Sequence, residues 1–174
     1  MFEIARSSAS HKNEWNQFVA QSKNGTFLFD RNYMDYHSDR FEDHSLLFYR
    51  EKRLYALMPA NENAHIFYSH QGLTYGGLIM DKQCTAAQVC LLFRELTDYL
   101  RLHGFRKVIY KPVPTVFRQL PADEDLYAIF ISCHAKLKAR DLSSAINSAY
   151  PVKWRYGRKY DAHKAIAAGL AVNK

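Results

Sequence analysis

The sequence predicts an α/β (α+β) domain in which a mixed, largely antiparallel sheet is flanked by helices. Two observations carry this prediction. Short apolar runs separated by turn residues fill much of the first half, a pattern typical of antiparallel strands. Amphipathic segments alternate with apolar runs in the second half, which is typical of helical crossovers between strands. A chain of 174 residues, 48% of them hydrophobic, is also long enough to bury a continuous core.

Two helices and then four strands are predicted in the first half. The first helix covers residues 11–22, where apolar residues repeat at helical spacing, and Asn24-Gly25 ends it. The second begins at Asp30 or Asn32, either of which can cap it, and runs to about residue 37. The strands are predicted at residues 45–49 and 54–58, which form a hairpin, and at residues 66–69 and 73–80.

Helices alternate with strands in the second half. A helix is predicted over residues 86–103, because its apolar residues repeat at intervals of three and four. Thr85 and Gln88 have the spacing of a capping box at its start, and Gly104 follows its end. Beyond it, strands are predicted at residues 105–110 and 137–146, and helices at residues 123–133 and 154–170.

Composition excludes several classes of protein. No apolar run approaches the ~20 residues that span a bilayer, and the first residues lack the apolar region of a signal peptide. Cys84, Cys90 and Cys133 do not have the spacing of a zinc site. They are expected to be free thiols in a reducing cytoplasm, and no metal is predicted.

Positive charge is concentrated at the C-terminal end. Residues 151–174 carry six basic side chains and one acidic one, so this segment holds +5 of the net charge of +7. A basic segment can bind nucleic acid, or it can be the solvated face of a helix. We favour the solvated face, because no nucleic-acid-binding signature accompanies the charge.

The segment Tyr68-Ser-His-Gln-Gly-Leu-Thr-Tyr-Gly-Gly77 gathers hydroxyls, an imidazole and an amide around three glycines. Glycine lets the backbone approach a ligand closely, so polar side chains beside it suit a lined cleft. An ordinary turn between two strands is the alternative.

Several segments resemble the first half of FemAB-like acyltransferases, which carry two domains of the GNAT acyltransferase fold. The similar segments are Trp15-Asn-Gln-Phe-Val19, Asn24-Gly-Thr-Phe-Leu-Phe29, Leu57-Met-Pro-Ala60, Ser69-His-Gln-Gly-Leu-Thr-Tyr-Gly-Gly77, Tyr110-Lys-Pro112 and Asp125-Leu-Tyr127. Their order and spacing carry the resemblance over essentially the whole chain. It implies a GNAT-like domain at residues 1–152, followed by a basic linking helix at residues 153–174 that leads toward a second half.

The resemblance also implies an acyl-CoA-dependent transfer to a small-molecule amine. Acetyl-CoA or another acyl-CoA is expected in the complete enzyme, handled by the second half, while this half forms the acceptor cleft. The sequence shows no glycine-bearing pyrophosphate loop of the GNAT type, since Gly104 ends a helix and precedes a strand. This chain alone is therefore expected to bind acyl-CoA weakly or not at all.

Acyl transfer needs a base for the amine and donors for the oxyanion. His70 is the candidate base, because imidazole titrates near neutral pH; a hydrogen bond to a turn carbonyl is the alternative. Tyr75 is the candidate donor, although a buried tyrosine hydroxyl commonly has a structural partner instead. These two are the predicted catalytic residues.

The predicted substrate-binding residues are Arg31, Ser69, Gln71, Thr74, Lys111 and Arg140. Arg31 belongs to a polar set at residues 31–40 that can bind a charged acceptor or pair along its own helix. Lys111 ends a predicted strand, where ligand contacts are common, and a solvated lysine is the alternative. Arg140 alternates with Ser143 and Asn147 on a predicted strand that lines the cleft or lies at an edge.

Two other classes of function stay open at this point. One is a non-catalytic binding or assembly module that needs a partner half, and a weaker one is a basic nucleic-acid-binding domain. The helix at residues 154–170 carries Tyr156, Tyr160, Ala167 and Leu170 on one stripe. This stripe predicts contact with a second half or with a second copy in a homodimer.

Overall fold

The computed structural model describes residues 1–142, 144–147, 149–150 and 153–171, which form two compact units. The first unit covers Met1–Lys138 and contains both sheets, and the second covers Ala139–Lys174. The predicted boundary at residue 152 between a GNAT-like domain and a linking helix stays a prediction.

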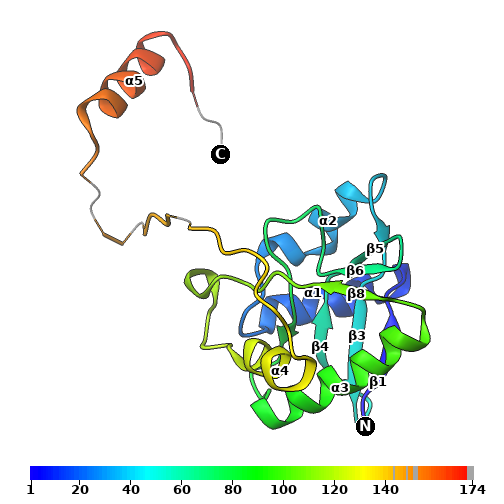
Figure 1. Cartoon of the computed structure of the whole chain (residues 1–174). Coiled ribbons are helices and arrows are strands. Elements are labelled where there is room, and N and C mark those ends of the chain that lie inside the picture. Colours follow the sequence, from blue (N-terminus) through cyan, green and yellow to red (C-terminus); the bar gives the residue numbers. More distant parts are fainter. Residues whose placement is uncertain (143, 148, 151–152, 172–174) are drawn as a thin grey trace. The chain divides into compact units, whose positions relative to one another are not determined.

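Two four-stranded sheets form the centre of the first unit (Figure 1). One has the order β1-β3-β4-β7 and is antiparallel throughout. The other has the order β2-β5-β6-β8, and only its β6–β8 pair is parallel. The strands are β1 (Glu3–Arg6), β2 (Glu42–Asp43), β3 (Leu46–Arg50), β4 (Arg53–Met58), β5 (Asn61–Asn63), β6 (Ile66–Tyr68), β7 (Ile79–Met80) and β8 (Lys107–Ile109). The predicted mixed, largely antiparallel arrangement is confirmed.

Tight turns join the central strands. The predicted hairpin is confirmed as β3 and β4, joined by Glu51 and Lys52 at φ 51° and 63°. Ala64 and His65, at φ 46° and 63°, make the corresponding turn between β5 and β6. Positive φ at both central residues is the geometry of type I′ turns, which match the twist of antiparallel strands.

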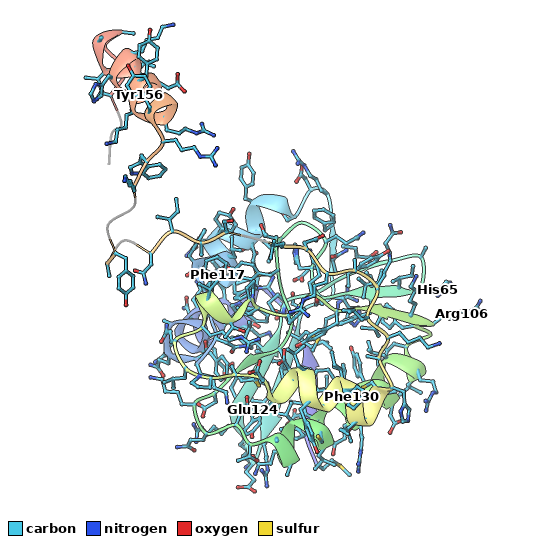
Figure 2. All side chains as sticks on the ribbon, turned by 60° about the vertical axis from the view of Figure 1, so that its left-hand side comes forward. His65, Arg106, Phe117, Glu124, Phe130 and Tyr156 are labelled. Carbon is cyan, nitrogen blue, oxygen red and sulfur yellow. The ribbon has the colours of Figure 1, made fainter. Side chains whose placement is uncertain are left out.

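The parallel pair begins beside the second of these turns. The Arg106 N–H donates to the His65 carbonyl at 2.9 Å, and Figure 2 shows both residues at one end of the sheet. Strand β8 is reached through helix α3, so the connection from β6 to β8 is the crossover that parallel strands require.

Helices cover both faces of the sheets. The α-helices are α1 (Lys12–Gln21), α2 (Arg31–Met34), α3 (Ala86–Leu102), α4 (Glu124–Cys133) and, in the second unit, α5 (Tyr156–Ala167). Short 3-10 turns occur at Ala9–His11, Phe27–Phe29, Asp35–His37 and Thr115–Phe117. The predicted helices are thereby confirmed, and the Asp30 side chain caps α2 by accepting from Asn32 N–H at 2.8 Å.

The alternation of side chains on β3 and β4 divides the core into two layers. Leu46, Phe48 and Met58 pack with α3 and α4 on one face. Leu47 and Leu57 pack on the other face with Trp15 of α1, Phe29 and Ile79. Successive residues of a strand point to opposite faces, so one hairpin supplies the centre of both layers.

Three predicted details are wrong. Residues 73–80 form a strand only at Ile79–Met80, because the preceding loop is bound to Lys111 instead of to a strand. Residues 137–142 and 144–147 are not a strand, and their side chains are exposed. Helix α3 begins at the predicted place without a capping box, since Gln88 accepts a hydrogen bond from the Tyr55 hydroxyl instead.

The end of α3 has the predicted glycine cap. Gly104 has φ 80°, and the Phe105 N–H donates to the Leu100 carbonyl at 3.0 Å. This is the Schellman arrangement, in which a left-handed residue closes the last turn. Gly104 therefore ends a helix and does not cradle a phosphate.

Helix α5 exposes the apolar side chains of its predicted stripe. Tyr156 is 83% exposed and Tyr160 is 58% exposed, whereas Leu170 of the predicted stripe lies beyond the end of α5 at Ala167. We expect the purified protein to be a homodimer, because an exposed apolar stripe usually marks a contact surface and two-fold pairs are the commonest assemblies. Sedimentation velocity measures this directly. Tyr160→Glu is expected to give monomers, and a wild-type monomer at about 100 μM would contradict the prediction.

His44 is a buried histidine at the junction of the two sheets. It is 3% exposed, its Nδ1 lies 2.8 Å from Glu62 Oε1, and its Nε2 lies 3.1 Å from the Tyr99 hydroxyl. Burial lowers the pKa of His44 below its usual 6.5 and outweighs the opposing effect of its hydrogen bond to the Glu62 carboxylate.

We expect the protein to lose stability as the pH falls below about 6.5, because the unfolded chain then binds a proton more readily than buried His44 does. The stability from neutral His44 is complete above that pH and is lost as the pH falls through the lower folded pKa. Urea unfolding at about pH 7.5 and about pH 5 measures the loss. His44→Gln is expected to reduce this difference; an unchanged difference would contradict the assignment.

Candidate functional site

The loop from Ser69 to Leu78 is fixed to the end of β8. The Ser69 N–H donates to the Ile109 carbonyl at 2.9 Å, and the Ser69 hydroxyl accepts from the Lys111 N–H at 2.7 Å. The Gly76 N–H donates to the Lys111 carbonyl at 3.0 Å. Ser69, a predicted substrate-binding residue, is fully buried and holds the loop in this way.

Two glycines permit this close packing. A Cβ on Gly76 would lie 1.9 Å from the Ser69 carbonyl oxygen. Gly77 has φ 87°, and a Cβ there would lie 2.8 Å from the Tyr110 hydroxyl. That hydroxyl accepts from the Leu78 N–H at 2.7 Å and donates to Asp125 at 2.5 Å. Burial raises the pKa of the Asp125 carboxyl.

This loop holds His70 in an uncommon conformation. His70 has φ 69° and is 4% exposed, and its ring meets that of Phe41 at 5.7 Å between centroids. The next residue is anchored as well, because Gln71 N–H donates to Asn61 Oδ1 at 2.7 Å and Asn61 Nδ2 donates to the Gln71 side chain at 2.8 Å. Positive φ raises the conformational free energy of a histidine, so this backbone conformation persists only where the surrounding contacts hold it. Such strain often occurs at functional sites.

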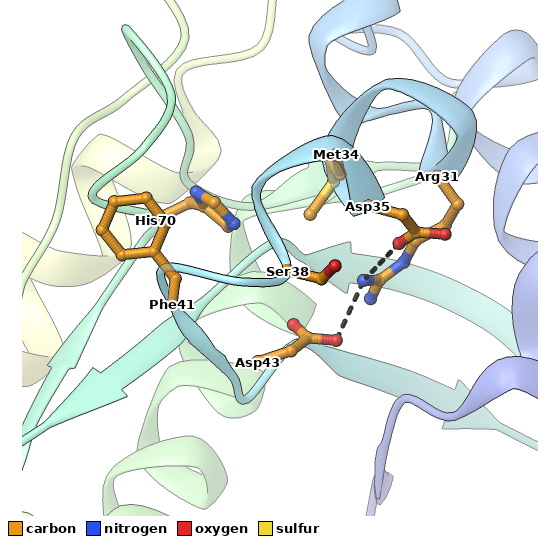
Figure 3. A pocket seen from close by; sticks show the side chains of 7 residues that line it. All are labelled: Arg31, Met34, Asp35, Ser38, Phe41, Asp43 and His70. Atoms are coloured by element: carbon orange, nitrogen blue, oxygen red, sulfur yellow. Dashed lines mark hydrogen bonds and ion pairs between the residues drawn. The ribbon is translucent and has the colours of Figure 1, made fainter.

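His70 lines a pocket of about 80 Å³ together with residues 31–43 (Figure 3). The lining residues are Arg31, Met34, Asp35, Ser38, Phe41, Asp43 and His70. The structure thus brings together predicted base His70 and predicted substrate-binding residue Arg31, which lie 39 positions apart in sequence. The walls of the pocket combine the apolar side chains of Met34 and Phe41 with charged and polar side chains.

The Arg31 guanidinium lies in this pocket beside the carboxylates of Asp35 and Asp43. It lies 4.2 Å from the centroid of the Trp15 ring, and its Nη1 is 2.9 Å from Asp43 Oδ2 and 3.8 Å from Asp35 Oδ1. Asp35 also pairs with Lys12 at 3.2 Å. The pairs balance two positive against two negative charges and fix the orientation of Arg31.

The remaining predicted residues do not line this pocket. Tyr75 lies in the core, stacked on Phe117 at 5.4 Å, and its hydroxyl is 3.3 Å from Thr26 Oγ1. Lys111 Nζ donates to the Leu73 carbonyl, and burial lowers the pKa of Lys111. Tyr75 and Lys111 therefore stabilise the loop and do not contact the pocket.

Three further predicted residues are exposed to solvent. Thr74 and Gln71 are exposed on the loop, and Arg140 is exposed in the second unit. Asn147 is exposed too, whereas Ser143 lies outside the described residues.

A second, wider hollow of about 600 Å³ lies beside α1 and the start of α2. Its lining residues are Asn16, Val19, Ala20, Gly25, Thr26, Phe27, Asp30, Asn32, Tyr33 and Gln119. Tyr75 reaches this hollow only through its bond to Thr26. The lining of this hollow contains one acidic residue and no basic one. We therefore place the candidate acceptor site in the smaller pocket.

Ser38, Phe41, Met34 and Asp43 are pocket residues that sequence reasoning did not select. The sequence signal for them is the density of polar side chains in residues 31–43, of which the predicted polar set covers only residues 31–40. Arg40 and Asp39 pair with each other on the surface at 3.8 Å, with more than half of each side chain exposed. Periodicity does not separate the inward-facing members of this short segment from the outward-facing ones.

The connection from β7 to α3 joins the end of a strand to the start of a helix, which is the arrangement that a pyrophosphate loop needs. Residues 81–85 contain no glycine, and the Asp81 carboxylate lies there, 2.8 Å from Arg53 and accepting from Gln83 N–H at 2.7 Å. A loop that binds a pyrophosphate before a helix usually contains glycine, which lets the backbone N–H groups approach the phosphates closely. This connection therefore suits a phosphate poorly.

Cysteine and metal chemistry find little support in the described part of the chain. Cys84 is buried, and burial raises its pKa to about 11, so the thiol is unreactive at neutral pH. Among the residues that the structure describes, no group of three or more His, Cys, Asp or Glu side chains is placed to hold a metal ion. Within the same residues, no helix is both long and apolar enough to cross a membrane.

No family model and no curated protein matches this chain. Among solved structures, it is similar to an aminoglycoside acetyltransferase from an uncultured soil metagenomic sample, in complex with sisomicin. The TM-score is 0.42 at 14% identity, over 87% of this chain and 97% of that chain. A likeness at this level carries no argument about function.

Proposed function

We propose that this chain is an acyltransferase-related domain of the GNAT/FemAB-like type that forms the acceptor side of an acyl-CoA-dependent N-acyltransferase. The pocket of Arg31 and His70 is the acceptor site, and a small-molecule amine is the acceptor. His70 takes the proton from the amine as it attacks the acyl carbonyl, and the C–S bond of the thioester breaks with the coenzyme A sulfur as the leaving group.

The single observation that carries the proposal is the juxtaposition of His70 with the Arg31 pocket (Figure 3). A base must lie within hydrogen-bond reach of the proton that it removes, and a fixed charge beside it orients the substrate. The loop holds His70 through its neighbours Ser69 and Gln71, which bond to β8 and β5 respectively. These contacts restrict the imidazole before any substrate binds.

The proposal assigns the acyl donor to another part of the complete enzyme. The β7–α3 connection at residues 81–85 contains no glycine, its Gln83 N–H is bound to Asp81, and Gly104 is used as a helix cap. When bound, the acyl-CoA would supply a thioester carbonyl for attack. The residues of this chain bind and orient the amine and accept its proton.

An assay of acyl transfer tests the proposal. The assay uses the protein in the form that its source organism makes. Labelled acetyl-CoA is offered with a panel of amino sugars and amino acids, and the products are identified by mass spectrometry. We expect N-acetylation of at least one amine and its loss on substitution of His70. Binding of an amine in the pocket without transfer by the natural protein would instead support the non-catalytic binding module.

A further inference from the structure

One nitrogen of the Arg31 guanidinium has no hydrogen-bond acceptor among the described residues. Arg31 is 7% exposed, and its Nη2 is buried from solvent and unpaired, while Nη1 is held by Asp43. A buried donor without an acceptor costs about 1–3 kcal/mol, so native structures rarely leave one. Figure 3 shows the guanidinium directed toward the space between Ser38 and Asp43.

The nearby carboxylates have other partners. Asp43 Oδ1 accepts from the Ser45 N–H at 3.0 Å and from the Ser45 hydroxyl at 2.5 Å. Asp43 Oδ2 accepts from Arg31 Nη1, and Asp35 pairs with Lys12. Neither carboxylate supplies an acceptor to Arg31 Nη2, which leaves that position to a ligand.

The arrangement holds Arg31 ready for such a ligand. The backbone N–H of Arg31 donates to Asn16 Oδ1 at 2.8 Å, and the Trp15 ring lies 4.2 Å from the guanidinium. A guanidinium fixed in this way loses little conformational entropy on binding and forms a strong charge-assisted hydrogen bond with an oxyanion.

Size and lining restrict the ligand. A volume of about 80 Å³ accommodates a carboxylate with a few further atoms, but not a sugar ring with its substituents. Met34 and Phe41 form apolar walls, and Ser38 supplies a hydroxyl. His70 lines the same small space, so a carboxylate on Arg31 places a neighbouring amine close to the imidazole.

We propose that the acceptor is a small amino acid whose carboxylate binds Arg31 Nη2. This inference rests on the proposed function, because it names the substrate class of the same pocket. The amine, one carbon from the carboxylate, lies toward His70, and the carboxylate fixes its position. An amine without a carboxylate leaves the Arg31 nitrogen unpaired and binds more weakly.

The test compares glycine with glycinamide, which differ only in the carboxylate. Binding to the whole chain is followed by ¹H–¹⁵N NMR titration with no acyl donor present. Fragments of this size bind in about the millimolar range, and we expect glycine to bind about 10-fold or more tighter than glycinamide. Arg31→Lys is expected to reduce this ratio below about 3-fold, because lysine does not reproduce the fixed fork geometry.

Two further variants keep the test decisive if Arg31→Lys unfolds. Ser38→Phe places a ring in the pocket and leaves the ion pairs of Arg31 untouched, so it is expected to abolish glycine binding. Arg40→Lys is the matched control, since Arg40 is a surface arginine that pairs with Asp39, and it is expected to keep the full ratio.

Three results would overturn the inference: equal binding of glycine and glycinamide, tighter binding of inorganic phosphate than of glycine, or no binding of either amine at about 100 mM. These outcomes are separate from the fate of the proposed function. Acyl transfer to amines that lack a carboxylate, unaffected by Arg31→Lys, would remove this inference and leave the acyltransferase. Selective glycine binding without any acyl transfer by the natural protein would remove the proposed acyltransferase function and leave the amino-acid site.

Discussion

Replacing Gly76 by alanine is expected to lower the free energy of unfolding by about 3 kcal/mol or more, because the new methyl group has no room. Its Cβ would lie 1.9 Å from the Ser69 carbonyl oxygen and 2.9 Å from the Ser69 carbonyl carbon. Both are backbone atoms of a loop that is bonded to Ile109 and Lys111, so they cannot move without breaking those bonds.

Gly104→Ala is the matched control for this prediction. Gly104 has φ 80°, and nothing lies within 4 Å of a Cβ placed there. Only the left-handed conformation opposes the methyl group, at a cost of about 1 kcal/mol. Urea unfolding of both variants measures the difference. If Gly76→Ala lost no more stability than Gly104→Ala, the close approach of the loop to Ser69 would be wrong.

The second large effect is expected on activity. His70→Asn should lower kcat/KM of the complete enzyme by about 10²–10⁴-fold, the usual contribution of a general base. Asparagine is chosen because it tolerates positive φ better than most residues and therefore keeps the loop conformation at φ 69°. The thermal unfolding temperature of the variant is measured alongside the initial rates.

His65→Asn is the matched control for the activity measurement. His65 also has positive φ, at 63°, but it is exposed in the β5–β6 turn and does not line the pocket. It should leave kcat/KM unchanged. Tyr75→Phe is expected to lower it by less than about 10-fold, since the Tyr75 hydroxyl bonds only weakly to Thr26. Equal activity of His70→Asn and wild-type protein would remove His70 from the mechanism.

Local patterns in the sequence predicted the elements whose structure depends on local interactions. Helix α3 buries Val89, Leu92, Phe93, Leu96 and Leu100, which repeat at the intervals of one helix face. The β3–β4 hairpin followed from two apolar runs around a short charged turn. In both cases the residues that determine the element are neighbours along the chain.

Elements that depend on distant contacts were not predictable in this way. Residues 73–78 alternate like a strand, but their polar groups bond to Lys111 and Tyr110. The segment from residue 137 that is predicted as a strand has no strand beside it among the described residues. Short strands such as β2 and β5 contain acidic and amide residues that local propensity assigns to loops.

The candidate site could be predicted only in part for the same reason. Residue type predicts His70 and Arg31 as site residues, yet their shared pocket follows from the fold. It also predicts Ser69 and Lys111, and both of these hold the loop in the structure. A polar side chain beside a glycine-rich turn has the same sequence signal whether it contacts a ligand or the backbone.

The central claim is that this chain holds the acceptor and not the acyl donor. One ¹H–¹⁵N NMR titration of the purified chain, with acetyl-CoA in one series and small amines in the other, tests it most directly. We predict that amines shift the resonances of Arg31, Ser38 and His70, while acetyl-CoA binds with a dissociation constant weaker than about 10 μM. Acetyl-CoA binding tighter than that value, with no amine shifting the pocket resonances, would contradict the account.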